Sequence, residues 1–444
     1  MMPGLCEELT GRPMRLTVRL VKIAFCLLPA FLVCARLKGQ QPSQAQSTAP
    51  ALRATVNEVL VPVVVRDAQG HSIGGLTKDD FQVFDNGKAQ TITGFLIVHR
   101  DIEDAAANSP ASAPDSAESP SVSQLNLPTQ RFVVFLFDDY NLKSVDLPSV
   151  RDAAIKALDS SLAPADFAAV LSTSGANSGL TRDHEKLKQS IRDLKANALL
   201  RSDEHSCFTV DYYIGDRISN KSDVLALQAQ TLEVARCLRN VTPEAAETIA
   251  RSGAERAVQL GEQSSLANLG AVRLILAKLM APLPGQHILV LISPGFFAPG
   301  SASATLQSEI LDLAARSNTV INTLDARGLY TTNPDAQVKR RDDSASQRLI
   351  DQYRNSSMEA NSGVMEELAD GTGGTFIHNS NDLEGGMKTL VSGAEYRYVL
   401  AFSVANAKSR AHHSLRVKVD QPGLTVQARR GYSASRLEKR TKRQ

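Results

Sequence analysis

Tryptophan is absent from this sequence, and aromatic residues as a whole are scarce. Phe, Trp and Tyr make up 5% of the 444 residues, too few for the stacking surfaces on which proteins bind single-stranded nucleic acid. A strong charge of either sign is also missing, because basic and acidic residues are equal in number outside residues 1–35. Without a positive field, nucleic acid is not expected among the partners. The length and the 43% of hydrophobic residues predict a globular protein of two or three domains.

A long hydrophobic run is missing as well. The apolar stretch at residues 23–33 is too short to span a bilayer comfortably. It follows four basic residues and ends in Val33-Cys34-Ala35, which offers a small residue at a cleavage position. We interpret residues 1–35 as an export signal peptide, so the mature protein is expected in the periplasm, in the cell envelope or secreted. The alternative is an uncleaved N-terminal anchor, which would be the only expected contact with a membrane.

Cysteine is rare in the rest of the chain. Outside this leader the sequence has only Cys207 and Cys237. A single pair of cysteines in an exported protein predicts a disulfide bond. Closing a loop of about 30 residues would stabilise the fold by roughly 3–4 kcal/mol in the loop-entropy model. The alternative is a pair of free, buried thiols.

Two polar segments divide the rest of the chain. Residues 36–52 predict a tether, and residues 99–129, rich in Ala, Ser and Pro, predict a disordered linker. Between them, residues 53–98 predict a small Ig-like β-sandwich. It contains a hairpin at Asp85-Asn86-Gly87, since Asn-Gly is the strongest short hairpin signal, and a single helical turn capped by Thr77.

From residue 130 to residue 395, predicted strands alternate with predicted helices. This alternation is typical of a doubly wound parallel sheet. The clearest strand is the apolar run 132–137, which reads as a strand covered on both faces. A helical insert is expected at 200–262, and a polar loop at 331–355.

The pattern changes after residue 395. Residues 396–434 predict three antiparallel strands, which we interpret as a separate C-terminal β-extension. Residues 435–444 form a basic tail. This tail is either solvated or in contact with an anionic surface.

The best candidate site follows the apolar strand. Asp138 and Asp139 come directly after it, and ligands of open α/β sheets bind at the carboxyl ends of the strands. Oxygen donors held at such an edge suit Mg²⁺ or Ca²⁺. With Asn141 and Thr181 they form the predicted metal site. The alternative is that Asp138 or Asp139 caps a helix or pairs with a neighbouring base. Further oxygen donors that would complete the site or merely cap turns are Ser144, Ser293 and Asp325.

The order of these motifs resembles the von Willebrand factor A family, whose metal-ion-dependent adhesion site consists of D-x-S-x-S, a Thr and a further Asp. Asp138 matches the first Asp and Thr181 the Thr. Tyr140, Leu142 and Pro294 stand where the family has its two Ser and its last Asp. The resemblance therefore implies a degenerate adhesion site that keeps two of the five ligands.

The whole chain resembles the exported von Willebrand factor A-related proteins of acidobacteria. The motifs are PVVVRDAQGHSIGGLTKDDFQVFDNGKAQTITGF, VVFLFDDYN and QARRGYSA. This resemblance implies an α/β fold, a doubly wound, Rossmann-like von Willebrand factor A-type domain with an N-terminal Ig-like β-sandwich and a C-terminal β-extension. It also implies a non-enzymatic, adhesion-type protein that recognises a protein partner at the top of the sheet.

Two other function classes remain open at this point. One is a metal-independent scaffold for a cell-envelope complex. The other, a hydrolase, has less support, because neither a G-x-S-x-G nor an HExxH motif occurs. The glycine-rich run 371–374 follows a predicted helix and precedes a strand, the reverse of a phosphate-binding loop.

Overall fold

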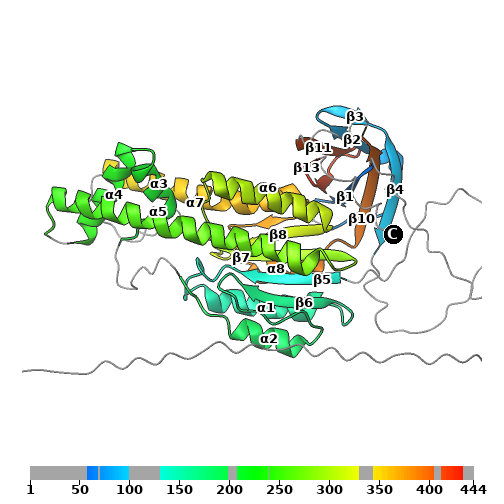
Figure 1. Cartoon of the computed structure of the whole chain (residues 1–444), viewed down its shortest axis with the longest axis horizontal. Coiled ribbons are helices and arrows are strands. Elements are labelled where there is room, and N and C mark those ends of the chain that lie inside the picture. The colour runs from blue at the N-terminus through cyan, green and yellow to red at the C-terminus, as the bar shows by residue number, and fades with distance from the viewer. Residues whose placement is uncertain are drawn as a thin grey trace, which may run out of the picture. The chain divides into compact units, whose positions relative to one another are not determined.

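The α/β part of the chain is built on a five-stranded sheet, which Figure 1 shows among its helices. The computed structural model describes residues 58–68, 71–99, 131–198, 208–238, 240–329, 344–404 and 412–433. The strands are parallel and lie in the order β6-β5-β7-β8-β9. They are β5 (Arg131–Phe137), β6 (Phe167–Ser172), β7 (Gln286–Ser293), β8 (Thr319–Asp325) and β9 (Phe376–Ile377). The predicted doubly wound parallel sheet is confirmed.

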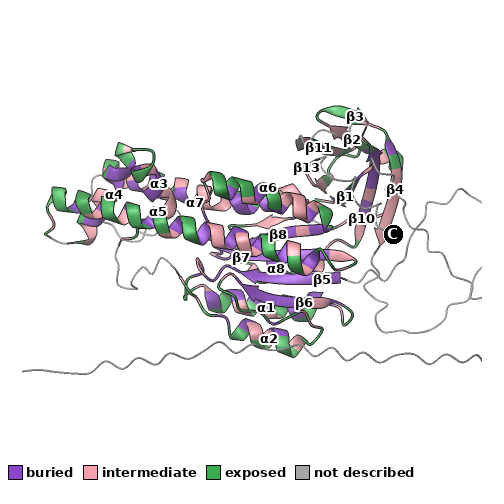
Figure 2. Ribbon diagram, in the orientation of Figure 1, coloured by how far each residue is buried: buried purple, intermediate pink, exposed green. Residues whose placement is uncertain are grey.

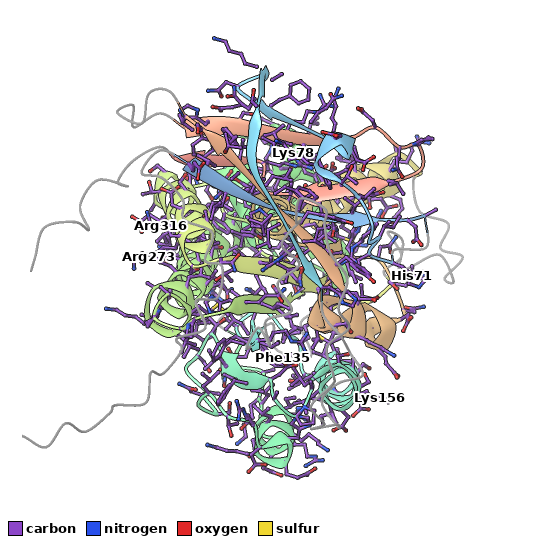
Figure 3. The ribbon with its side chains drawn as sticks, turned by 90° about the vertical axis from the view of Figure 1, so that its right-hand side faces the viewer. His71, Lys78, Phe135, Lys156, Arg273 and Arg316 are labelled. Carbon is purple, nitrogen blue, oxygen red and sulfur yellow. The ribbon has the colours of Figure 1, made fainter. Side chains whose placement is uncertain are left out.

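Helices cover both faces of this sheet. Val133, Phe135 and Phe137 of β5 point into one apolar layer, and Val134 and Leu136 point into the other. All are buried, which explains why the strand is apolar without alternation (Figures 2 and 3). The first layer contains α1 (Leu147–Ser161), α2 (His184–Arg192) and α8 (Leu383–Ser392). The second contains α5 (Pro243–Leu274), α6 (Ser301–Arg316) and α7 (Ser344–Thr372).

The predicted insert is a helical lobe with its own apolar core. It contains α3 (Tyr212–Ser219), α4 (Val224–Cys237), the first half of α5 and the start of α7. The predicted boundary at residue 262 is wrong, because α5 runs through it and continues into a π-helical turn at Ile275–Met280. Gly261 lies inside α5 where a Cβ would come within 2.3 Å of the Tyr212 ring. This glycine permits close packing and does not end the helix.

The start of α7 also differs from the prediction. Residues 344–355, expected in a polar loop, are helical. Their apolar contacts come from Ile350 and Tyr353, which are buried in the core of the lobe. Two such residues among many polar ones were too weak a signal for a helix.

The predicted N-terminal β domain and C-terminal β-extension form a single sandwich. Its first sheet has the order β12-β1-β10-β4, and its second the order β13-β11-β2-β3. Each sheet therefore contains strands from both ends of the chain, which alternate in the first sheet and pair β11 with β2 in the second, and the two sheets share one apolar core. The strands are β1 (Glu58–Arg66), β2 (Phe81–Asp85), β3 (Lys88–Gln90), β4 (Ile92–His99), β10 (Tyr396–Ser403), β11 (His412–Val419), β12 (Thr425–Ala428) and β13 (Gly431–Ser433).

The local predictions inside the sandwich are confirmed. Asn86 and Gly87 join β2 to β3 with positive φ angles of 48° and 78°, as a tight hairpin of the primed type requires. Thr77 precedes the single helical turn Lys78–Asp80. Its backbone N–H donates to the Asp80 carboxylate at 2.7 Å.

Only one of the two cysteines of the predicted disulfide lies among the described residues. Cys237 is the last residue of α4 and is disulfide-bonded. Cys207 lies outside the described residues, as do the leader, the tether and the linker. The pairing of Cys207 with Cys237 therefore stays a prediction.

An unusual pair of buried basic side chains lies near the start of β7. The Nδ1 atom of His287 lies 2.5 Å from the carbonyl oxygen of Ser317, while its buried Nε2 and the buried Nη1 of Arg397 have no hydrogen-bond partner among the described residues. Burial lowers the pKa of His287, the Ser317 carbonyl opposes this shift, and the positive charge of Arg397 adds to it. His287 therefore binds a proton less readily in the folded protein than in the unfolded chain.

Acid should therefore weaken the fold through His287. Because the folded pKa is lower than the unfolded one, the unfolded chain binds the proton more readily, and stability is lost as the pH falls through about 6.5. Each unit of lowering corresponds to about 1.4 kcal/mol. Replacing His287 with Asn, which keeps a donor for Ser317, should reduce the difference in unfolding free energy between pH 7 and pH 5, measured with urea. The exposed control His378→Asn should leave that difference unchanged; an equal effect of both variants would contradict this explanation.

Candidate functional site

The carboxyl edge between β5 and β7 carries the candidate site. The chain passes from β5 to β6 on one side and later to β7 on the other side. The connections therefore diverge at this point, where open α/β sheets form their binding crevice. Asp138 and Asp139 follow β5, and Ser293 ends β7. The structure thus places both predicted carboxylates at the expected edge.

The Asp138 carboxylate is fully buried and hydrogen-bonded. Its Oδ2 accepts from Ser293 Oγ at 2.6 Å and from Asn141 Nδ2 at 2.8 Å, and its Oδ1 accepts from the Asn141 backbone N–H at 3.2 Å. Burial raises the pKa of Asp138, and the hydrogen bonds from Ser293 and Asn141 oppose that rise. Its oxygens are thus used to fix the turn at 138–142 and to join it to β7.

Asp139 faces a different set of partners. Its Oδ1 accepts from the backbone N–H of Ser174 at 2.9 Å, and its Oδ2 accepts from the Ser174 hydroxyl and from Asn197 Nδ2 at 2.8 Å. The backbone N–H of Asn197 also donates to the Asp139 carbonyl, at 2.7 Å. Asp139 therefore fastens the loop after β6 and the segment after α2. Its carboxylate does not converge with that of Asp138 on a shared ligand.

Helix α5 contributes site residues that the sequence analysis missed. Ser264 Oγ donates to Asn141 Oδ1 at 3.1 Å, and Thr173 Oγ1 donates to Asn268 Oδ1 at 2.5 Å. Asn268 is fully buried, and its Nδ2 makes no hydrogen bond to any residue that the structure describes. Its amide lies near Asp138 and opposes the rise in the pKa of that carboxyl. A signal existed in the sequence: residues 264 and 268 continue, at helical spacing, the apolar stripe of Leu269 and Val272.

Thr181 does not reach this site. After β6 the chain turns back, and Thr181 pairs with Ala168 near the start of that strand. Ala168 is level with Val133 in β5, which lies five residues before Asp138, or roughly 16 Å at the usual rise of a strand. The residue that stands beside the end of β5 is Thr173, whose N–H donates to the Phe137 carbonyl at 3.0 Å. The expected role of Thr181 as a ligand is therefore not supported by its position.

The remaining candidates lie on the rim. Asp325 ends β8 and pairs with Arg327, whose Nη2 lies 2.6 Å from its Oδ2, so it binds its own turn. Burial raises the pKa of Asp146 in the loop after β5, the charge of Lys143 opposes that rise, and the charge of Asp325, next to the loop after β8, adds to it. Both loops expose an apolar side chain, Val145 at 77% and Leu329 at 53%. Ser144 is exposed in the first of these loops.

These positions do not fit a metal ion well. The carboxylates of Asp138 and Asp139 point to different partners, and Asn141 and Ser293 already donate to Asp138. Across the described parts of the chain, no group of three or more His, Cys, Asp or Glu side chains is arranged to hold a metal. A Mg²⁺ or Ca²⁺ ion would have to displace hydrogen bonds that hold the turn together.

Comparison with known proteins adds no function to this geometry. No protein-family model and no curated protein matches the chain. Within the residues that the structure describes, no helix is long and apolar enough to cross a membrane.

Proposed function

We propose that this protein is an exported, non-enzymatic binding protein that recognises a protein partner at the carboxyl edge of the α/β sheet. The observation that carries the proposal is the rim itself. Val145 and Leu329 expose apolar surface on the loops that follow β5 and β8, at the edge where this class of fold binds its ligands. Contiguous apolar surface with a polar rim is typical of protein interaction sites.

The buried polar network beneath the rim supports a binding role that needs no metal. Hydrogen bonds from Asn141 and Ser293 hold Asp138, and hydrogen bonds from Ser174 and Asn197 hold Asp139. Such a network keeps loops in one conformation, and a preorganised surface loses less entropy on binding. A binding role without a metal fits a scaffold-type recognition protein related to the von Willebrand factor A family.

In the adhesion-type alternative, a cation binds at Asp138 and a carboxylate of the partner completes its coordination. This alternative predicts that Mg²⁺ or Mn²⁺ raises the melting temperature and that binding is lost in chelator. Asp138→Asn removes the charge that a cation needs, but it also turns an accepting oxygen into a donor that faces Asn141 or Ser293, so it weakens both versions. Chelator separates them: binding that is unchanged in chelator supports the network alone.

A capture experiment tests the proposal. The full-length mature chain, with and without Val145→Asp and Leu329→Asp together, is cross-linked to cell-envelope extracts of its own host in chelator. We expect one partner to be recovered with the parent chain and at least a tenfold loss with the rim variant, because two charges would enter an apolar contact. The matched control is Leu274→Asp. Leu274 is an apolar residue of α5 that is 56% exposed and lies outside these loops.

Two outcomes would refute the rim as the recognition surface. One is equal recovery of the partner with the rim variant and the parent chain. The other is equal loss with the rim variant and the Leu274→Asp control.

A further inference from the structure

A cleft of about 390 Å³ opens between α6, α7 and β13, away from the site described above. Its charged lining is acidic on the α/β side. The carboxylates come from Asp312 of α6 and from Glu366, Glu367 and Asp370 of α7. The opposite wall is formed by Arg430, which precedes β13, and by Gly431 and Tyr432 of β13.

One guanidinium already lies at this acidic wall. Arg430 pairs with Asp370 at 2.7 Å. Asp312, Glu366 and Glu367 make no hydrogen bond or ion pair with any residue in the described part of the chain. The cleft therefore keeps a surplus of negative charge, which favours a cationic occupant.

The chain supplies a segment of the required charge at the required place. The described residues end at Ser433, the last residue of β13. Residues 436–443 follow with the sequence RLEKRTKR, which has five basic residues and one acid. A separation of three residues corresponds to at most about 10 Å of extended chain, so the first basic residue, Arg436, starts within reach of the cleft.

The walls of the cleft also suit the stems of basic side chains. Leu311 and Tyr432 provide apolar surface beside the carboxylates. The methylene chains of Lys and Arg pack on apolar surface while their charged ends meet carboxylates. Gly363 of α7 leaves room in the same lining, because a Cβ built there would meet no atom within 4 Å.

We propose that the basic segment 436–443 docks in the acidic cleft between α6, α7 and β13 of its own chain. The ion pair of Arg430 with Asp370 begins this contact, and the basic residues of the segment continue it along Glu366, Glu367 and Asp312. The docked segment fastens the sandwich to helices α6 and α7 through charge, so the contact weakens as the salt concentration rises.

Carbodiimide cross-linking of the full chain tests the proposal. This reagent joins a lysine amine directly to a carboxylate that it contacts, and Lys439 and Lys442 are the lysines of the segment. After digestion and mass spectrometry, we expect these lysines to be linked to Glu366, Glu367 or Asp312. The yield should fall at least fivefold in 1 M NaCl, where the Debye length is about 3 Å.

Three variants make the test specific. Glu366→Gln with Glu367→Gln should reduce linkage to the cleft at least fivefold, including linkage to the unchanged Asp312. Gly363→Phe keeps every carboxylate and should reduce linkage by filling the space. The control is Glu359→Gln, an exposed acid on the same helix that does not line the cleft, and it should change nothing. Unchanged melting temperatures show that the variants fold.

The opposite results would overturn the proposal. One is linkage of Lys439 and Lys442 to Glu359 as often as to Glu366 or Glu367. Another is a yield that neither salt nor the cleft variants reduce. A mixture of isotope-labelled and unlabelled chains gives the third: if all links join two different chains, the occupant is a second copy and the assignment within one chain is wrong.

Discussion

A chain that ends at Gly393 is expected to lose the folded structure of its N-terminal β strands. Strand β1 pairs with β10 on one side and β12 on the other, and β2 pairs with β11. All three partners come from residues after 393. Without them, a segment of about 40 residues keeps few strand partners and too little core to fold alone. Residues 58–99 should then become sensitive to protease and exchange their amide hydrogens at the rate of an unfolded chain.

The α/β sheet provides the internal control in this experiment. Strands β5 to β9 and helix α8 are all retained, so their amides should stay protected. A chain that ends at Ser433 lacks only the tail and keeps strands β10 to β13. The amides of its N-terminal strands should therefore stay fully protected. Protected amides in β1 of the chain that ends at Gly393 would mean that the N-terminal strands fold as an independent domain.

Replacing Arg131 with Met is expected to lower the unfolding free energy by about 3–5 kcal/mol, the usual cost of breaking a buried ion pair. Arg131 is 2% exposed and pairs with the buried carboxylate of Asp166. The same guanidinium donates to the carbonyls of Ser161 at 2.7 Å, Val391 at 2.7 Å and Ser392 at 2.9 Å. It thus joins the start of β5 to the ends of α1 and α8.

Urea denaturation of the single and double variants measures this effect. The double variant Arg131→Met, Asp166→Leu should recover most of the loss, because it leaves no buried charge without its counter-ion. The exposed pair of Lys156 with Glu384 is the control, and Lys156→Met should change the unfolding free energy by no more than about 0.5 kcal/mol. A loss below 1 kcal/mol for Arg131→Met would show that the carbonyls and Asp166 find other partners.

The sequence predicted individual strands better than their partners. The strand 131–137 and the hairpin at Asn86-Gly87 depend on local patterns, and both are present. The pairing of β1 with β10 depends on residues far apart in the chain, and alternating hydrophobicity contains no information about which strand lies next to which. This is why one sandwich was predicted as two separate parts.

The helical lobe shows a different limit. Gly261 and the serines that follow it are poor helix formers, so a boundary at 262 was the natural interpretation. Packing of the Tyr212 ring against Gly261 outweighs that preference. The Tyr212 and Tyr213 rings also lie 5.4 and 5.3 Å from Phe297, in the loop after β7. Contacts of this kind stabilise a helix through its surroundings, which a local pattern cannot show.

The candidate site was predicted in part. Asp138, Asp139 and Asn141 lie where the end of an apolar parallel strand predicts them, and Ser293 joins them because neighbouring strands are in register. Thr181 was misplaced because the chain folds back along β6. The Asn268 contribution depends on how α5 crosses the edge of the sheet, which is a tertiary feature.

The shared sandwich has a consequence for how the protein is made. Strands β1 to β4 leave the ribosome long before β10 to β13 are synthesised. Until then β1 has both of its edges unpaired, and exposed strand edges of apolar sequence are the segments that associate wrongly with other chains. Synthesis of the α/β sheet in between delays closure, so newly made protein should depend on holding chaperones until nearly its whole length has emerged.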